Sequence, residues 1–207
     1  MNTSKVQIVI IDDNRKETDA LIVSLKMHFK DADIILKKQA KEGLDYILNN
    51  FNKKTIVLLD YDFGSGEPNG TELFKKIREK TSLIYVIMIT ANNINNIPYD
   101  DLIEYINNNA FAFVYRTISI AEIKPIIEKA IHSLDSRVDG ALEQWINLHT
   151  EDEKKAPYIL SRNGKSYTLN QILEEIRHQT DLGREIEKDI LMLAIDMLAR
   201  GKKNIYG

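Results

Sequence analysis

Short apolar runs alternate with segments of helical periodicity along roughly the first 115 residues. The runs are rich in Ile and Val and mostly lack the period-two alternation of a half-exposed strand. Runs of this kind indicate strands that are buried on both faces, as in a parallel sheet covered by helices. The five predicted strands are 6–11, 33–36, 55–59, 84–89 and 111–115.

The segments between these runs carry apolar residues at helical intervals, for example Leu44, Ile47 and Phe51. Strand and helix alternate five times, which predicts an α/β fold with a doubly wound parallel sheet. Right-handed crossovers, together with a reversal after the first unit, predict the flavodoxin-like strand order 2-1-3-4-5.

The fifth predicted helix is longer than the sheet requires. Ser119 and Glu122 form a capping box at its start, and its apolar stripe continues to about residue 149. We therefore predict an N-terminal domain of residues 1–139 whose last helix extends to about 149. A helix of this length can form a homodimer with a second copy, or it can cover the start of the next module.

The rest of the chain, residues 150–207, predicts a small C-terminal module that is α+β or mostly helical. Residues 151–156 are polar and indicate a linker. Asn163 and Gly164 lie between two β-prone runs, a strong signal for a hairpin turn. Two amphipathic helices follow, so the module should be a hairpin followed by two helices.

Composition excludes several functions. The chain of 207 residues has no Cys, which rules out disulfide scaffolds, thiolate metal sites and cysteine nucleophiles. A net charge of −3 lacks the basic footprint of a nucleic-acid binder. The apolar runs are too short to span a bilayer, and no secretory leader is evident. We expect a cytoplasmic protein that binds neither DNA nor membranes.

Six polar residues follow the carboxyl ends of the predicted strands, the edge at which open parallel sheets bind ligands. Carboxylates gathered there are costly unless a cation intervenes or some are protonated. Oxygen ligands without nearby His or Cys favour Mg²⁺. The alternative is that each Asp merely caps the helix that follows it. The six residues are Asp12, Asp13, Asp60, Asp62, Thr90 and Arg116.

Over about residues 5–135, the sequence resembles the receiver domain of two-component response regulators. Any one of the matching motifs alone would be weak, but together and in this order they are specific. They are Asp12-Asp13-Asn14, Leu59-Asp60-Tyr61-Asp62, Gly70-Thr71-Glu72-Leu73, Met88-Ile89-Thr90-Ala91 and Phe113-Val114-Tyr115-Arg116.

The resemblance implies a phosphorelay response regulator that switches a protein–protein interaction and is not a turnover enzyme. Asp60 would accept a phosphoryl group from a histidine kinase or a phosphotransfer protein. Asp13, Asp60 and the backbone carbonyl of Asp62 would hold Mg²⁺, with Asp12 acting partly through water. The target of the C-terminal module stays open.

The resemblance also implies roles for residues on the last two strands. Thr90 would donate its hydroxyl to a phosphoryl oxygen, and Arg116 would supply positive charge. Phe113 would be the aromatic switch that turns inward as Thr90 moves, although a plain core aromatic explains it equally well.

Two departures from the family pattern bear on activity. Receiver domains normally have Lys followed by Pro where this chain has Arg116-Thr117, and Arg is larger with a planar fork. The loop between Asp60 and Gly70 is also longer than usual. Both departures bear on whether phosphorylation proceeds normally.

Two other functions also fit part of the sequence. The first is a receiver-like binding module that no longer accepts phosphate. The second is a haloacid-dehalogenase-like phosphatase with Asp60 as nucleophile and Asp62 as acid/base. In those phosphatases the metal-binding Asp pair comes late in the chain, whereas Asp12 and Asp13 come first, and this order argues against the phosphatase.

Overall fold

The computed structural model describes residues 5–50, 53–64, 66–160 and 164–201. The chain forms two compact units that divide between Leu134 and Asp135. The predicted boundary, after residue 139, lies slightly later in the chain.

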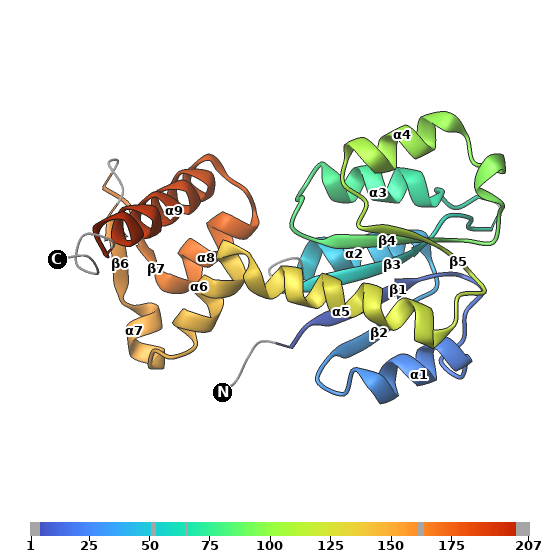
Figure 1. Ribbon diagram of the computed structural model, residues 1–207, viewed down its shortest axis with the longest axis horizontal. Coiled ribbons are helices and arrows are strands. Elements are labelled where there is room, and N and C mark those ends of the chain that lie inside the picture. Colours follow the sequence, from blue (N-terminus) through green and yellow to red (C-terminus); the bar gives the residue numbers. More distant parts are fainter. Residues whose placement is uncertain (1–4, 51–52, 65, 161–163, 202–207) are drawn as a thin grey trace. The chain divides into compact units, whose positions relative to one another are not determined.

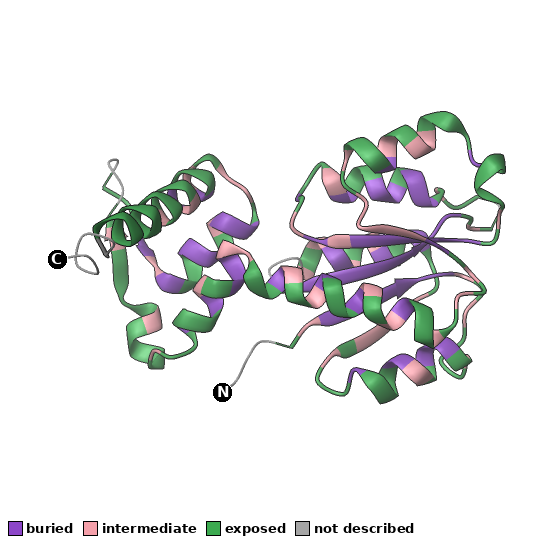
Figure 2. Ribbon diagram, in the orientation of Figure 1, coloured by how far each residue is buried: buried purple, intermediate pink, exposed green. Residues whose placement is uncertain are grey.

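The N-terminal unit contains a five-stranded parallel sheet of order β2-β1-β3-β4-β5, which confirms the predicted topology (Figure 1). The central strands are fully buried because helices cover both faces (Figure 2). The strands are β1 (Gln7–Ile11), β2 (Asp33–Lys37), β3 (Thr55–Asp60), β4 (Tyr85–Thr90) and β5 (Ala112–Tyr115).

Alternate residues of each strand serve two different cores, as the strand period of two requires. Ile8 and Ile10 pack with the helices on one face, whereas Val9 and Ile11 pack with those on the other. The first face carries α1 (Ala20–His28) and α5 (Ile120–Ser136). The second carries α2 (Ala40–Asn50), α3 (Gly70–Arg78) and α4 (Tyr99–Asn107), the last preceded by the short 3₁₀ helix η1 (Ile94–Asn96).

The single helix expected to reach residue 149 is instead two helices. α5 ends at Ser136, and α6 (Val138–Ile146) begins after Arg137, whose backbone is extended with φ −76° and ψ 158°. The apolar stripe continues across this break because it serves both units. Leu134 belongs to the N-terminal core, whereas Leu142 and Ile146 pack in the C-terminal unit.

The C-terminal unit comprises α6, α7 (Glu151–Lys155), the antiparallel strands β6 (Pro157–Leu160) and β7 (Ser166–Thr168), and two further helices, α8 (Leu169–Arg177) and α9 (Asp181–Gly201). The hairpin and the two last helices agree with the prediction, although Asn163 of the predicted turn lies outside the described residues. The predicted linker is instead α7, which a capping box of Thr150 and Glu153 begins.

A buried group of ion pairs joins α6 to α8. Asp139 is only 2% exposed and receives hydrogen bonds from Arg137 at 2.9 Å and from Arg177 at 3.2 Å. Arg177 also lies 3.1 Å from Glu143. Burial opposes ionisation of Asp139, but the two arginines outweigh it, and the pKa of Asp139 falls below its ordinary value.

Within the described parts of the chain, no helix is both long enough and apolar enough to cross a membrane.

Candidate functional site

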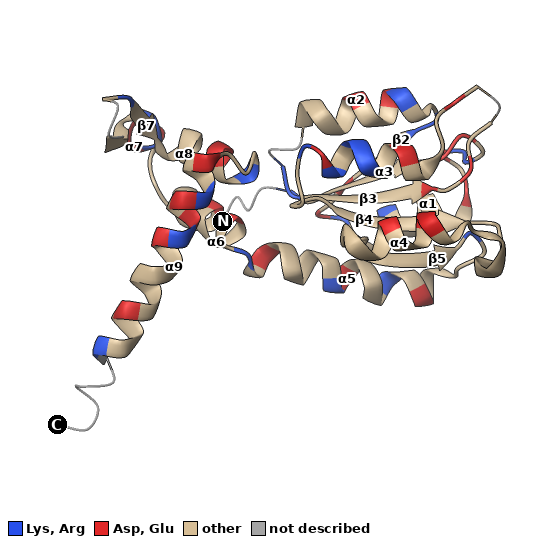
Figure 3. Cartoon of the chain, turned by 90° about the horizontal axis from the view of Figure 1, so that it is seen from above, with Lys and Arg blue, Asp and Glu red and all other residues tan. Residues whose placement is uncertain are grey.

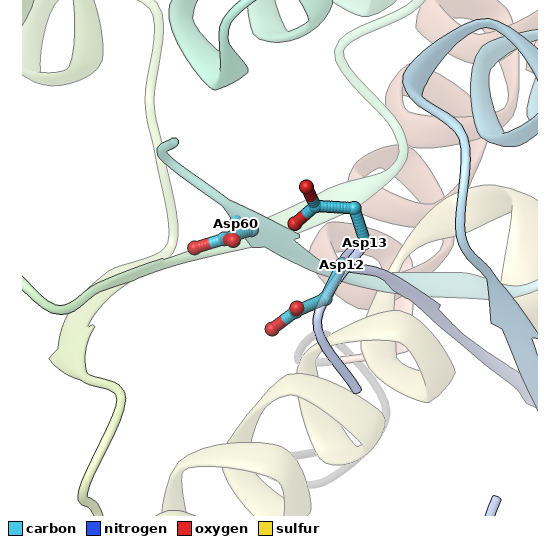
Figure 4. A group of neighbouring side chains, drawn as sticks. All are labelled: Asp12, Asp13 and Asp60. Atoms are coloured by element: carbon cyan, nitrogen blue, oxygen red, sulfur yellow. The ribbon is translucent and has the colours of Figure 1, made fainter. Parts of the chain in front are cut away.

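The register of the sheet brings the first and third strands into line at their carboxyl ends. Ile11 pairs with Leu59, so Asp12 and Asp60 follow side by side. One carboxylate oxygen from each of Asp12, Asp13 and Asp60 lies within 4.8 Å of the other two. Figure 4 shows the three carboxyl groups projecting to the same side, beyond the ends of β1 and β3. Three of the four Asp residues predicted at this edge therefore form one cluster.

Burial makes this cluster electrostatically costly. Asp12 and Asp60 are 1% and 2% exposed. Burial, followed by the nearby charge of Asp12, raises the pKa of Asp60 from 3.8 to about 7, against the opposing effect of Arg116. Burial and like charges both favour the neutral acid. Asp60 is therefore a carboxyl group that changes charge near neutral pH.

Arg116, at the end of β5, is the cation that partly offsets this cost. Its Nη2 donates hydrogen bonds to Asp60 Oδ2 at 2.5 Å and to Asp12 Oδ1 at 2.9 Å. Burial lowers the pKa of Arg116, but the carboxylates of Asp60 and Asp12 outweigh burial and raise it. The guanidinium group therefore stays charged and bridges the two buried acids.

A second arginine, which the sequence reasoning missed, also reaches the cluster. Arg15 Nε lies 3.3 Å from Asp12 Oδ2, and Arg15 Nη2 donates to the backbone carbonyl of Arg116 at 3.2 Å. The backbone N–H groups of Asn14 and Arg15 donate to Asp12 Oδ1, so the chain turns back on Asp12. This turn brings Arg15, three residues after Asp12, to the carboxylate. The short spacing in the sequence was the signal that could have suggested the contact.

Thr90 and Asp62 occupy different positions relative to the three acids. Thr90 is fully buried at the end of β4, and its Oγ1 accepts a hydrogen bond from the backbone N–H of Asn92 at 3.0 Å. The exposed side chain of Asp62 accepts a hydrogen bond from Asn92 Nδ2 at 2.5 Å. It stands outside the three-carboxylate cluster found among the described residues. Asn92, two residues after Thr90, was also missed.

The long loop after β3 is attached to the site at two points. Gly64 N–H donates to Asp13 Oδ2 at 3.0 Å, and Gly70 N–H donates to the carbonyl of Tyr61 at 2.9 Å. A Cβ atom at Gly70 would lie 2.2 Å from the carbonyl oxygen of Asp60, so the close approach requires glycine. Within the loop, Glu67 accepts a hydrogen bond from Ala40 N–H at the start of α2.

Phe113 lies on β5 in an aromatic cluster and is half-buried. Its ring packs 5.8 Å from that of Tyr105, which in turn packs edge-on against Phe74 at 5.3 Å. The Tyr105 hydroxyl forms a hydrogen bond with Thr71 Oγ1. These contacts establish a packing role for Phe113, and its switch role remains a prediction.

The donor set suits a hard divalent cation. The cluster offers only carboxylate oxygens, the ligands that Mg²⁺ prefers. Asp12 Oδ2 is buried and accepts no hydrogen bond from the described residues, although Arg15 lies close to it. A buried carboxylate oxygen without a hydrogen bond is costly, and a cation bound by the cluster would satisfy it.

Comparisons with known proteins identify the fold of the N-terminal unit. No protein-family model matches the sequence, and no curated protein matches it. Solved structures do match. A CheY-like response regulator receiver domain from Methanospirillum hungatei JF-1 has a TM-score of 0.52 and 22% identity, covering 64% of this chain and 98% of that one. A receiver domain from Clostridium thermocellum has a TM-score of 0.51 and 20% identity, covering 62% and 95%.

A third structure agrees with these two. The signal receiver domain of a putative LuxO repressor protein from Vibrio parahaemolyticus has a TM-score of 0.50 and 17% identity, covering 70% of this chain and 99% of that one. The N-terminal unit therefore has the fold of response regulator receiver domains. These three structures cover 62–70% of this chain.

Proposed function

We propose that this chain is a response regulator whose N-terminal unit accepts a phosphoryl group on Asp60. The observation that carries the proposal is the buried Asp60 carboxyl group, clustered with Asp12 and Asp13 and in contact with the Arg116 guanidinium. A structural ion pair needs only one acid and one base, whereas this edge of the sheet concentrates three acids beside two arginines.

The proposed reaction is an in-line phosphoryl transfer. An ionised oxygen of Asp60 attacks the phosphorus of a phosphohistidine on a kinase or phosphotransfer protein. The O–P bond forms as the P–N bond breaks, and the bonding electron pair stays on the imidazole nitrogen. Such a transfer depends on positive charge around the phosphoryl oxygens more than on covalent help from the protein.

The chain's own residues supply part of that charge and orientation. Arg116 already contacts the attacking carboxyl group. Its positive charge opposes the rise in the pKa of Asp60 that burial and Asp12 cause, and this favours the reactive ionised form. Thr90 stands at the neighbouring strand end, where its hydroxyl would donate to a phosphoryl oxygen. Mg²⁺, held by Asp12, Asp13, Asp60 and the backbone carbonyl of Asp62, would add charge stabilisation of the transferred group.

The proposed output is a changed protein–protein surface. Phosphorylation would draw Thr90 toward the phosphoryl group, and Phe113 would turn inward. Phe113 packs on Tyr105 of α4, so its movement would alter the surface formed by α4 and β5. The expected setting is the cytoplasm, with a histidine kinase as partner.

Labelling with a small-molecule phosphodonor tests this proposal. Acetyl phosphate carrying ³²P and Mg²⁺ should label the full chain with up to one phosphoryl group, and hydroxylamine should remove it, as expected of an acyl phosphate. Asp60→Asn should take up none, whereas Asp62→Asn, at an exposed side chain nearby, should still be labelled. Equal labelling of Asp60→Asn, or no labelling of the wild type, would contradict the proposal.

One observation favours a second candidate, a binding module that accepts no phosphate. Arg116 bridges Asp12 and Asp60, so the site has a cation without any metal. This candidate predicts no label with acetyl phosphate and no Mg²⁺-dependent response to beryllofluoride. Sustained release of phosphate from a generic phosphomonoester would instead indicate a phosphatase.

A further inference from the structure

The last helix of the C-terminal unit has two halves of different character. Leu182, Ile186 and Ile190 of its first half pack with residues of β7 and α8 in the core of that unit. A Cβ atom at Gly183 would lie 2.0 Å from the carbonyl oxygen of Glu175, so α8 and α9 touch through their backbones. The first half of α9 is therefore fixed within its own unit.

The second half of α9 is apolar and uncovered. Nine of the ten residues from 190 to 199 are Ile, Leu, Met or Ala, yet every residue from 191 to 200 is exposed. Figure 2 shows this half of the helix coloured as exposed, and Figure 3 shows that it carries few charges. A helix with so little polar surface is normally buried. The large exposed side chains are Leu191 (47%), Met192 (57%), Leu193 (61%), Ile195 (59%), Met197 (65%) and Leu198 (75%).

These side chains form two stripes on opposite sides of the helix. At 3.6 residues per turn, Leu193 and Met197 continue the stripe of Ile190. Ile190 itself packs against the core of the unit. Leu191, Ile195 and Leu198 form the other stripe, and none of them belongs to the core clusters found among the described residues of this unit.

We propose that the stripe of Leu191, Ile195 and Leu198 pairs in parallel with the same stripe of a second copy of this chain. The 3–4 spacing places Leu191 and Leu198 at d positions and Ile195 at an a position of a heptad. Leu at d with a β-branched residue at a is the combination that favours parallel two-stranded pairs. Lys188 falls at the preceding a position, where a single polar residue fixes register and partner number.

The exposed area supports a second copy as the partner. Met192, Ala194 and Ala199 flank the stripe, and together these residues offer roughly 600 Å² per chain, so two copies would bury roughly 1,200 Å². That value is at the lower edge of stable protein interfaces. We therefore expect weak dimerisation that depends on protein concentration.

The composition of α9 argues against a membrane as the partner. The helix holds five acidic and three basic residues and no aromatic residue. Helices that lie on membranes are rich in Lys and Arg on the polar face and in Trp or Phe on the apolar face. A negatively charged helix without aromatic anchors lacks both features.

Analytical ultracentrifugation of the full chain between about 2 and 300 µM tests the proposal. The wild type should shift from the mass of one chain to that of two. Ile195→Glu should weaken dimerisation at least tenfold, whereas Leu193→Glu, the same change on the opposite stripe, should leave it within about threefold. Both positions are exposed in the single chain, so circular dichroism should show an unchanged fold.

Cysteine cross-linking tests which residues of this stripe face each other in the pair. The chain has no Cys of its own, so only the introduced residues can form disulfides. In a parallel pair, Ile195→Cys, Leu191→Cys and Leu198→Cys should each form a disulfide with their own counterpart, since disulfides need Cα atoms within about 7 Å. Leu193→Cys should not. Cross-linking only between mixed Leu191→Cys and Leu198→Cys chains would overturn the parallel arrangement.

Three results would overturn the proposal entirely. The first is a single-chain mass at 300 µM with no disulfide from Ile195→Cys. The second is a dimer that survives Ile195→Glu. The third is binding to phosphatidylcholine/phosphatidylglycerol vesicles that Ile195→Glu abolishes. Phosphorylation of Asp60 is not required for any of these measurements.

Discussion

Replacing Asp60 by Asn should stabilise the N-terminal unit in the absence of metal. The folded protein raises the pKa of this carboxyl group from 3.8 to about 7. One pKa unit corresponds to 1.36 kcal/mol, so the ionised carboxylate costs the folded state up to about 4 kcal/mol at high pH. The amide of Asn keeps the shape of the side chain and an oxygen that can accept from Arg116, but carries no charge.

The sign of the pH dependence follows from the direction of this shift. Because the pKa of Asp60 is higher in the folded state, the folded protein holds the proton more tightly than the unfolded chain does. The destabilisation is absent below pH 3.8, grows between pH 3.8 and 7, and is constant above pH 7. We expect Asp60→Asn to gain about 1.5 kcal/mol at pH 5 and about 3–4 kcal/mol at pH 8.

Urea denaturation in EDTA at the two pH values measures this effect. Circular dichroism follows both units, whereas fluorescence of Trp145, the only Trp, follows the C-terminal unit, whose midpoint should not move. Asp62→Asn removes the same charge from an exposed side chain, so its effect should stay below about 1 kcal/mol at both pH values. A gain for Asp60→Asn that is equal at pH 5 and pH 8, or a loss at pH 8, would refute the electrostatic reasoning.

Three further variants test other parts of the structure. Gly70→Ala should destabilise the N-terminal unit by about 2–4 kcal/mol in urea denaturation, because its Cβ would clash with the carbonyl of Asp60. An unchanged midpoint would contradict the close approach of Gly70 to Asp60. Asp139→Ala should destabilise the C-terminal unit by about 3–5 kcal/mol, read from Trp145 fluorescence, because it removes the buried carboxylate that Arg137 and the buried Arg177 share. Arg116→Met should raise the pKa of Asp60 further, by about one unit in an NMR titration, since Arg116 is the charge that lowers it. An unchanged pKa would show that Arg116 does not act on Asp60.

The sheet and the acid cluster could be predicted because they depend on local pattern and on topology. Buried parallel strands such as 55–59 have unbroken apolar sequences. The inferred strand order makes β1 and β3 neighbours, so Asp12 and Asp60, at their carboxyl ends, must lie side by side. This inference needs no knowledge of side-chain direction. The prediction needed only the ends of the strands.

Other features could not be predicted because they depend on contacts or on signals that periodicity does not carry. The apolar stripe from Ile123 to Ile146 reads as one helix, because its spacing does not show where one core ends and the next begins. The short helix α7 has no apolar face, so its polar sequence resembled a linker. Arg15 was missed because its guanidinium reaches the site only through the turn that follows β1.

The two arginines bear directly on how a cation would bind. Asp12, Asp13 and Asp60 carry three negative charges when all are ionised, and Arg15 and Arg116 carry two positive ones. With Asp60 protonated, the site is close to neutral, which agrees with a pKa of about 7 for that group. A divalent cation bound here would add two positive charges, so it would bind best with Asp60 ionised and Arg116 moved away from it. Because Arg116 bonds both Asp60 and Asp12, we expect cation binding, ionisation of Asp60 and release of Arg116 to be linked.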